Sequence, residues 1–530
     1  MSTTRLDPVA LAADFSAYVW SATTADVAAR HGLRAEQVLR FDQNTPSLPG
    51  IPQIPLAESF ARLNEYPDGT YRELREAAAA YVGLGAESWP QIVVGAGADD
   101  LILLCARTFL SGGRRAAIAT PTYVVYRQAS QLAGAGVGEE IEGADLIWRC
   151  NPNNPTGEVV AAAELVALAR SVPRVPVVVD EAYVEFGGES VVLFLAEAPN
   201  LIVLRTMSKA FGFASLRVGY AVASPDVAAV LEERRAPAPI AGPASRIAAA
   251  ALRDPRLDVV ETVAERERVR QALSATGLDA PPTATNFVYV RSGKPLAAEL
   301  EAKGLVVRSV AGGIRITVRK PVDNDVLLRA LGVDAPLSPS RSATVIRTTT
   351  ETALRITLDL DGSSRVRVAT GIGFLDHLLT LMVFHAGFDL DLVAGGDLEV
   401  DEHHTVEDVL ASLGDTLAQA LGTRNGVTRY GAAIVPMDEA RATAAVDLVR
   451  RPHAEIALAF AGDRVGGLAL SLLPHALERF AMQAGCTVHV QASGRDDHHV
   501  AEAAFKALGR ALREACAPGA AGIRSTKGAA

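Results

Sequence analysis

Two short clusters pair adjacent histidines with a glutamate, which makes them candidate metal sites. They read His403-His404-x-x-Glu407 and His498-His499-x-x-Glu502. Each cluster opens a segment with helical periodicity, so either histidine can share a helix face with the glutamate three or four residues later. Adjacent residues differ by about 100° around a helix, which favours two ions over one. Imidazole and carboxylate ligands suit a divalent first-row transition metal, including Mn²⁺.

These clusters belong to an internal repeat. Each copy has a single histidine followed ten residues later by a glycine, then the cluster, then a Leu-Gly pair six residues after the glutamate. The repeated glycines are Gly387, Gly414, Gly485 and Gly509. A lone histidine pair is often surface decoration, whereas two copies in register favour a metal site. The predicted ligands are His377, His403, His404, Glu407, His475, His498, His499 and Glu502. The repeat predicts a duplicated α+β domain with helices packed on one face of a sheet.

The second kind of chemistry is that of an amine. Lys209 is the only lysine before Lys294, and it lies in Thr206-Met-Ser-Lys-Ala-Phe-Gly212, directly after a strand-like run. A lone lysine is usually a solvated surface residue, but hydroxyl and small neighbours at a strand end favour a Schiff-base nucleophile. Nine of the ten histidines lie after Gly332–Ala343, a segment rich in Pro and Ser that predicts a surface linker. The chain therefore divides into two parts with different chemistry.

The first part alternates helical and strand-like segments. Helices are predicted at 71–81 and 98–109, and strands at 91–94, 116–119, 144–150, 175–179 and 201–204. This alternation predicts right-handed βαβ units, a mostly parallel sheet and an α/β fold, with ligands at the carboxyl ends of the strands. Three features lie at those ends: Gly95–Asp100, the tight turn Asn151–Gly157 and Asp180. Taken singly, the first is either a phosphate site or a plain strand–helix turn, and Asp180 is most often only a helix cap.

Four motifs of the first part together indicate a family. They are Asn151-Pro-Asn-Asn-Pro-Thr-Gly157, Asp180-Glu-Ala-Tyr183, Ser208-Lys-Ala-Phe-Gly212 and Leu216-Arg-Val-Gly-Tyr220. Residues 1–333 resemble the fold-type I pyridoxal-phosphate (PLP) aminotransferases, and the histidinol-phosphate aminotransferases most closely. The resemblance implies a large parallel-sheet domain over about residues 50–235, and a small α/β domain made of the N-terminal arm and residues 236–333.

The resemblance also implies roles for the matching residues. Lys209 would form the Schiff base with PLP and move the proton, Asp180 would pair with the ring nitrogen, and Arg315 would anchor the anionic end of the substrate. The remaining cofactor contacts would be Asn154 and Tyr183 at the ring hydroxyl, Tyr123 on the ring face, Ala98, Asp99, Ser208 and Arg217 at the phosphate, and Tyr66 at the phosphate of a second subunit.

The second part resembles the imidazoleglycerol-phosphate dehydratases over about residues 344–530. The motifs are Thr350-Glu-Thr352, Gly371–His377, Asp401–Asp408, Pro436–Glu439, Arg451-Pro452 and Ser525–Gly528. The resemblance implies two Mn²⁺ ions bridged by the substrate's imidazole, with ligands drawn from neighbouring subunits. Glu351 would be the acid/base or orienting carboxylate, and the substrate phosphate would be bound by Arg429, Arg451, Ser525 and Lys527.

The expected layout of the second part follows the repeat. A linker at 334–343 precedes two halves at about 344–430 and 431–516, and a phosphate-binding tail covers 517–530. The alternation of apolar and polar residues over Thr344–Asp361 predicts a single strand with one wet face. His385, His453 and His489 lack a repeated partner and are interpreted as mainly structural.

The composition limits the class of protein. A chain of 530 residues with 49% hydrophobic and 21% charged residues is expected to form two or three soluble domains. The net charge of −10 gives no indication of a nucleic-acid or membrane partner, and no apolar run is long enough to span a bilayer. Four scattered cysteines, without a CxxC pair or a signal-peptide pattern, favour a cytoplasmic protein with reduced thiols.

Together the two resemblances predict a bifunctional enzyme of histidine biosynthesis. Imidazoleglycerol phosphate would be dehydrated to imidazole-acetol phosphate, and transamination of that ketone with glutamate would give histidinol phosphate. Family precedent implies a homo-oligomer, with dimeric contacts in the first part and a trimer-based assembly in the second. Two alternatives stay open: the first part acts on other amino acids, such as aromatic ones, or the second part binds metal or supports assembly without catalysis.

Overall fold

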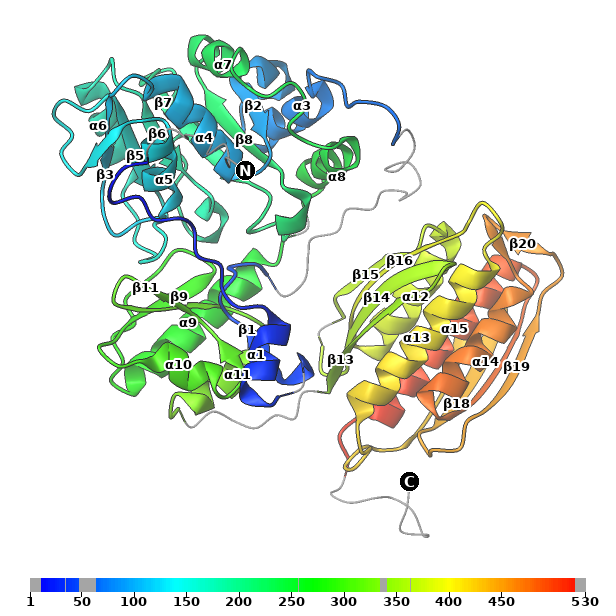
Figure 1. The fold of residues 1–530 in the computed structure, drawn as a ribbon. Coiled ribbons are helices and arrows are strands. Elements are labelled where there is room, and N and C mark those ends of the chain that lie inside the picture. Colours follow the sequence, from blue (N-terminus) through cyan, green and yellow to red (C-terminus); the bar gives the residue numbers. More distant parts are fainter. Residues whose placement is uncertain are drawn as a thin grey trace, which may run out of the picture. The chain divides into compact units, whose positions relative to one another are not determined.

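The computed structural model describes residues 11–33, 35–46, 63–255, 257–333, 341–362 and 364–519. The described residues form two compact units, one ending at residue 333 and the other beginning at residue 341 (Figure 1). This division falls inside the predicted linker, although strand β13 already begins at Ser342 and takes up the last two linker residues. Among the described residues, no helix has the length and apolar character needed to cross a membrane. All four cysteines are free, as predicted.

A seven-stranded sheet forms the centre of the first unit. Its strands are β2 (Ile92–Gly95), β3 (Arg115–Ile118), β4 (Gly136–Gly138), β5 (Leu146–Cys150), β6 (Val177–Asp180), β7 (Leu201–Thr206) and β8 (Gly219–Ala223). The order is β2-β8-β7-β6-β5-β3-β4, and every neighbouring pair is parallel except the two that involve β8. The mostly parallel sheet confirms the prediction, and β4 and β8 are the strands that the sequence pattern did not reveal.

Helices cover both faces of this sheet. They are α3 (Arg72–Tyr81), α4 (Ala98–Phe109), α5 (Val125–Leu132), α6 (Ala162–Ser171), α7 (Pro225–Glu232) and α8 (Gly242–Arg253), with short 3-10 turns η2 (Ala86–Gln91), η3 (Val184–Phe186), η4 (Val192–Phe194) and η5 (Ala214–Leu216). Successive strand residues point to opposite faces. Val177 and Val179 pack with α3, α6 and α8, whereas Val178 packs with α4, α5 and α7. Burial on both sides explains why the strands are continuous apolar runs.

A smaller layer completes the first unit. Its three-stranded antiparallel sheet has the order β11 (Arg308–Val310), β12 (Gly313–Thr317) and β9 (Phe287–Arg291). The accompanying elements are α1 (Thr24–His31), η1 (Ala35–Gln37), β1 (Leu39–Arg40), α9 (Val259–Ala275), α10 (Leu296–Glu301), β10 (Leu305–Val306) and α11 (Pro321–Ala330). Strand β1 pairs in parallel with β10, and Phe41 joins the core of this layer. The N-terminal arm is thereby fixed beside the small sheet.

The second unit consists of two copies of one fold. The first sheet has the order β13 (Ser342–Thr348), β14 (Thr352–Asp359), β16 (Asp389–Gly396) and β15 (Val366–Ala369), and the second has β17 (Tyr430–Met437), β18 (Ala440–Asp447), β22 (Thr487–Ser493) and β19 (His453–Ala459). In both sheets the last pair is parallel and the other pairs are antiparallel. A small hairpin joins β20 (Arg464–Val465) and β21 (Leu468–Ala469). The identical topology confirms the duplication.

Four helices lie between the two sheets (Figure 1). They are α12 (Gly373–Ala386), α13 (His403–Leu421), α14 (Leu472–Ala484) and α15 (Asp497–Cys516). Each sheet therefore has helices on one face, as expected. All four helices share one hydrophobic core, and α13 packs against α14 while α12 packs against α15. The helices of one half thus pair with the helices of the other half.

The repeated glycines make this pairing possible. Gly387 and Gly485 end α12 and α14 in the left-handed conformation, with φ of 77° and 59°. A Cβ on Gly414 of α13 would lie 2.3 Å from the Phe480 carbonyl oxygen of α14. A Cβ on Gly509 of α15 would likewise lie 2.1 Å from the Met382 carbonyl oxygen of α12. Any larger residue would force each helix pair apart.

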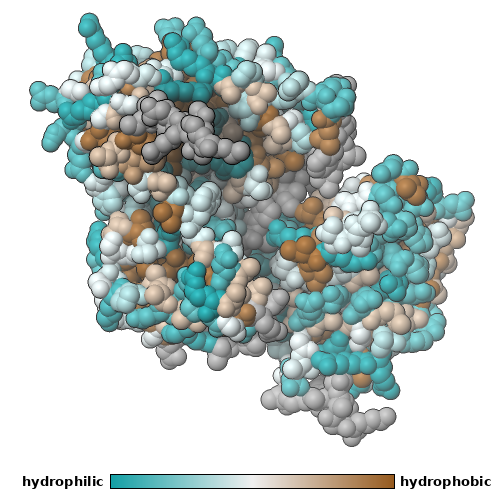
Figure 2. Space-filling model, viewed as in Figure 1, coloured by the Kyte–Doolittle hydropathy of each residue, from teal (hydrophilic) through white to brown (hydrophobic). Residues whose placement is uncertain are grey.

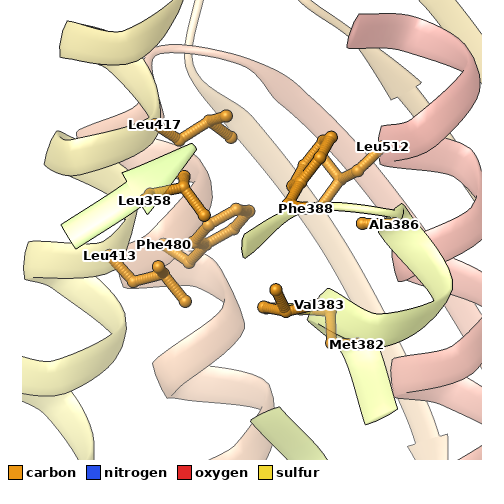
Figure 3. Close-up of a pocket in the computed structure, with 9 residues that line it drawn as sticks. All are labelled: Leu358, Met382, Val383, Ala386, Phe388, Leu413, Leu417, Phe480 and Leu512. Carbon is orange, nitrogen blue, oxygen red and sulfur yellow. The ribbon is translucent and has the colours of Figure 1, made fainter. Parts of the chain in front are cut away.

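The centre of this core contains one small apolar cavity. Nine side chains line it (Figure 3): Leu358, Met382, Val383, Ala386, Phe388, Leu413, Leu417, Phe480 and Leu512. Its volume of about 10 Å³ holds no more than one water molecule, and its lining offers no polar side chain. The cavity is a minor packing gap and carries no chemistry.

One predicted element was wrong. The single strand expected over 344–361 is a hairpin of β13 and β14, whose turn contains Thr349, Thr350 and Glu351. Only β14 buries alternate residues, whereas no residue of β13 is buried, and the turn contains no Gly or Pro that would mark it in the sequence. The turn matters because it carries Glu351.

Candidate active sites

The first site lies at the carboxyl edge of the parallel strands of the large sheet. Asp180 is the last residue of β6, and Lys209 follows the end of β7 by three residues. The Lys209 Nζ atom lies 3.5 Å from the Gln43 carbonyl oxygen and 5.6 Å from the centre of the Tyr183 ring. Burial, with the nearby Arg315 charge, lowers the pKa of Lys209 to about 8. A useful fraction of the amine is therefore neutral and nucleophilic near neutral pH.

Asp180 is a buried carboxylate, and each of its two oxygens accepts a hydrogen bond. The Tyr126 hydroxyl donates to Oδ2 at 2.7 Å, and the Ala182 backbone N–H donates to Oδ1 at 3.0 Å. Burial raises the pKa of Asp180 to about 6, and the two hydrogen bonds oppose that rise. The carboxylate does not cap a helix in the usual way, since 3-10 helix η3 begins only at Val184.

A group of residues that could hold an anion lies at the start of α4. Gly97 has φ of 81° and directly precedes Ala98, the first helical residue. Asp99 accepts from the Tyr123 hydroxyl and from the Arg217 guanidinium, both at 3.0 Å. A Cβ on Gly97 would lie 2.6 Å from the Arg217 Nη2 atom, so the guanidinium reaches the helix start because that residue is glycine. Free N–H groups with an arginine beside them suit a phosphate.

The opposite side of the site is formed by Arg315 of β12. Its guanidinium donates to the Asn154 side-chain oxygen at 2.7 Å and to the Asp42 carbonyl oxygen at 2.8 Å. Its buried Nε makes no hydrogen bond within the described residues, so one N–H of the guanidinium is unpaired there. Asn44, with φ of 53°, donates to the Tyr183 hydroxyl at 2.9 Å.

These predicted residues therefore meet in one place. Lys209 interacts electrostatically with Asp99, Asp180, Arg217 and Arg315. Ser208 is buried, with its hydroxyl 3.1 Å from that of Thr206. Tyr66 is 93% exposed, and its proposed contact with a second subunit stays a prediction.

Three residues of this site were not among the predicted site residues. Tyr126 holds Asp180, Asn44 holds Tyr183, and Tyr18 interacts electrostatically with both Tyr123 and Arg315. Tyr126 and Asn44 are fully buried polar side chains, which only tertiary packing can identify.

The second unit contains two clusters with metal-ligand geometry. The members of each cluster place their ligand atoms within 4.8 Å of one another: His403, Glu407 and His475 in one, and His377, His498 and Glu502 in the other. In the first, His475 Nε2 lies 3.2 Å from Glu407 Oε2, and in the second, His377 Nε2 lies 2.6 Å from Glu502 Oε1. Each cluster takes two ligands from one half of the repeat and one from the other. The paired helices bring them together.

The second histidine of each pair faces elsewhere. His404 Nδ1 lies 3.0 Å from Asp397 Oδ2, and His499 Nδ1 lies 3.0 Å from Glu439 Oε2. These carboxylates raise the pKa of both imidazoles. Only the first histidine of each pair shares a helix face with the glutamate. The sequence had allowed either histidine to do so. The geometry agrees with two separate ions for adjacent histidines.

Glu351 lies beside His404. We call His404 and His499, the second histidines of the two pairs, the outer histidines. The Glu351 side chain is 52% exposed, and its Oε2 is 3.8 Å from His404 Nδ1. Glu439 occupies the matching position, since each directly precedes the second strand of its hairpin. The two halves differ here, because Glu439 contacts His499 closely while Asp397 takes that role for His404.

Of the four residues predicted to bind the substrate phosphate in the second unit, the structure describes two. Arg429 forms a two-pronged ion pair with Asp447, at 2.7 and 3.0 Å, so its guanidinium already has a carboxylate partner. Arg451 is exposed. Ser525 and Lys527 lie outside the described residues. The phosphate site of this unit therefore stays a prediction.

A cation also contacts the glutamate of each metal cluster. Arg479 Nε lies 3.0 Å from Glu407 Oε1, and Lys506 Nζ is paired with Glu502 Oε2. In both clusters the other carboxylate oxygen faces the imidazoles. Neither cation was predicted as a site residue. His385, His453 and His489 belong to neither cluster.

Comparison with known proteins agrees with this division. The family model of class I and II aminotransferases matches residues 35–139 and 137–331, and that of imidazoleglycerol-phosphate dehydratases matches residues 370–512. The imidazoleglycerol-phosphate dehydratase of Gluconacetobacter diazotrophicus is 47% identical over 196 residues, which cover 36% of this chain and 99% of that protein. The dehydratase of Chloroflexus aggregans is 52% identical over 180 residues, covering 34% of this chain and 88% of that protein.

Structural comparison supports the first unit. The histidinol-phosphate aminotransferase of Sinorhizobium meliloti, solved with pyridoxal-5'-phosphate, has a TM-score of 0.53 and 25% identity, covering 60% of this chain and 97% of that chain. These matches cover both units with their candidate sites. The chain thus belongs to two enzyme families, joining a fold-type I aminotransferase of class I and II to an imidazoleglycerol-phosphate dehydratase domain.

Proposed function

We propose that the two units catalyse consecutive reactions. The second unit dehydrates imidazoleglycerol phosphate to imidazole-acetol phosphate, and the first unit transaminates that ketone with glutamate to histidinol phosphate. The observation that carries the proposal is the presence on one chain of both families, whose relatives here are named for these two steps. The product of one reaction is the keto substrate of the other.

The side chains of the first unit fit PLP, which membership of the aminotransferase family implies. When bound, PLP would supply an electron sink for the α-carbon of the substrate. The start of α4 and Arg217 would hold its phosphate, and Asp180 would pair with its ring nitrogen. Lys209, with its lowered pKa, would bind the cofactor and carry a proton between the substrate α-carbon and the cofactor. Arg315, whose buried Nε–H is unpaired within the described residues, would bind the anionic end of the substrate.

The side chains of the second unit fit two divalent metal ions. Each cluster offers two imidazoles and one carboxylate, a set suited to Mn²⁺ among the first-row metals. A bound metal would supply Lewis acidity at the substrate's imidazole. Glu351, half exposed beside His404, would orient the substrate or exchange a proton with it.

We also propose that other copies of the chain complete the metal sites. Within one chain each cluster has three ligands, and the outer histidines point away from them. Their Nδ1 atoms are engaged by carboxylates, which leaves Nε2 as the metal-binding atom. Light scattering should therefore show a homo-oligomer. A monomer that binds two metal ions per chain with full activity would contradict this proposal.

A coupled assay tests the function directly. Purified chain supplied with imidazoleglycerol phosphate, glutamate, PLP and Mn²⁺ should form histidinol phosphate. Chelation should stop water loss while transamination of added imidazole-acetol phosphate continues. Activity only with aromatic amino acids would favour another aminotransferase, and absence of water loss with metal restored would favour an assembly role for the second unit.

A further inference from the structure

The strongest feature outside the predicted residues is the contact between Tyr126 and Asp180. Tyr126 belongs to α5, and it has no exposed surface. Its hydroxyl donates to Asp180 Oδ2 at 2.7 Å. The other oxygen of Asp180 is taken by the Ala182 N–H at 3.0 Å. The carboxylate therefore cannot rotate without losing one of two hydrogen bonds.

Tyr126 is itself held on three sides. Its ring stacks on Trp148 of β5, with centres 5.1 Å apart and an angle of 10° between the planes. The Trp148 indole donates to the Ser130 hydroxyl at 3.2 Å, and that hydroxyl donates to the Tyr126 carbonyl oxygen at 2.7 Å. The Tyr123 ring packs edge-on against Tyr126. Such a support fixes where the phenol hydroxyl points.

We infer that Tyr126 is a positioning residue for transamination, acting through Asp180 on the ring nitrogen of the bound cofactor. Its hydrogen bond favours the ionised carboxylate in a buried place that otherwise favours the protonated acid. An ionised, fixed Asp180 keeps the ring nitrogen protonated, which the electron sink requires. The inference rests on the proposed function of the first unit.

Other titratable groups act on Asp180 as well. Lys209 and Asp99 interact with it from the other strand ends, and Cys150 lies opposite on β5. Lys209 and Asp99 are unchanged when tyrosine is replaced by phenylalanine, whereas the Cys150 thiol also loses its contact with the Tyr126 hydroxyl. Tyr126→Phe keeps the ring that stacks on Trp148 and removes only the hydroxyl, and the comparison in an Asp180→Asn background separates the contact with Asp180 from that with Cys150.

The test uses the visible absorbance of PLP bound to the full chain, titrated with pH. A protonated ring nitrogen withdraws electrons from the conjugated system of the bound cofactor. The nitrogen that links Lys209 to the cofactor therefore loses its proton at a lower pH. Tyr126→Phe should raise that midpoint by about half a pH unit or more, and should lower kcat about tenfold with little change in KM. Ser130→Ala disturbs the support of Tyr126 but keeps its hydroxyl, and should leave the midpoint unchanged.

A double-variant comparison separates positioning from a general structural role. In an Asp180→Asn background, Tyr126→Phe should change neither the midpoint nor kcat further, because its effect passes through Asp180. Additive effects, an unchanged Tyr126→Phe midpoint, or an equal shift in Ser130→Ala would overturn the inference. A wild-type chain without PLP absorbance, or a Lys209→Ala chain that still attaches PLP covalently, would refute the proposed function of the unit instead.

Discussion

The two units assemble their candidate sites in different ways. The first gathers an amine, a carboxylate and an anion site at one edge of one sheet, from strand ends that the topology already places together. The second builds each metal cluster from two halves of a duplication, across helix pairs that touch only because of glycine. The first site thus depends on buried electrostatics, and the second depends on how closely helices approach.

The largest expected effects separate the two chemistries. Lys209→Ala should lower transamination by about 10³-fold or more and prevent covalent attachment of PLP, while dehydration continues. His475→Ala should abolish dehydration while transamination continues, since it removes one ligand of a cluster whose other ligands lie on α13. Steady-state assays of each step measure both. Lys294→Ala and His489→Ala, at exposed positions, serve as controls. Loss of both activities in either site variant would mean that the sites are not independent.

A buried ion network in the first unit should be the next most sensitive feature. Arg205 of β7 is paired with Glu181 at 2.9 Å and with Glu185 at 3.1 Å. Arg205→Met would leave two buried acids without a counter-charge, so it should lower the free energy of unfolding of this unit by about 3–5 kcal/mol. Chemical denaturation followed by circular dichroism measures it.

The matched control is Arg253→Met, which breaks an exposed pair with Glu73 in the same unit. That change should cost less than about 1 kcal/mol. Equal losses of unfolding free energy in the two variants would show that the Arg205 network stabilises the unit no more than an exposed ion pair does.

Helix approach in the second unit can be tested with one methyl group. Gly414→Ala places a Cβ 2.3 Å from the Phe480 carbonyl oxygen and should destabilise this unit by about 1–3 kcal/mol. Gly467→Ala, where a Cβ would meet nothing within 4 Å, should change stability by less than about 0.5 kcal/mol. Calorimetry resolves the transition of the unit. If Gly414→Ala is as stable as the control, close helix contact does not set the cluster geometry.

The smallest effect is a pH dependence in the first unit. Burial lowers the pKa of Lys209 from 10.5 to about 8, and only the neutral amine reacts with an aldehyde. The rate of PLP uptake by the cofactor-free chain should therefore rise about tenfold per pH unit below this value and level off above it. Stopped-flow absorbance measures the rate. A rise that continues to pH 10 would show that Lys209 is solvated.

Much of the fold and site was predictable because the informative residues are local in sequence. The apolar runs of β5, β6 and β7 and the exact span of α4 follow from short-range patterns. The motifs around Asp180 and Lys209 identify their own chemistry. The hairpin turn at Thr349–Glu351 was missed because the polar run Arg347–Thr352 contains no Gly or Pro to mark a turn.

The sequence by itself determined which residue types carry the chemistry and that the second unit is a duplication. Only the tertiary structure decided that His475 joins His403 and Glu407, and that His404 faces Asp397 instead. It also revealed Tyr126 as the partner of Asp180. The physical reason is that periodicity fixes which face of an element a residue occupies, whereas the neighbour on that face is set by packing between elements far apart in the chain.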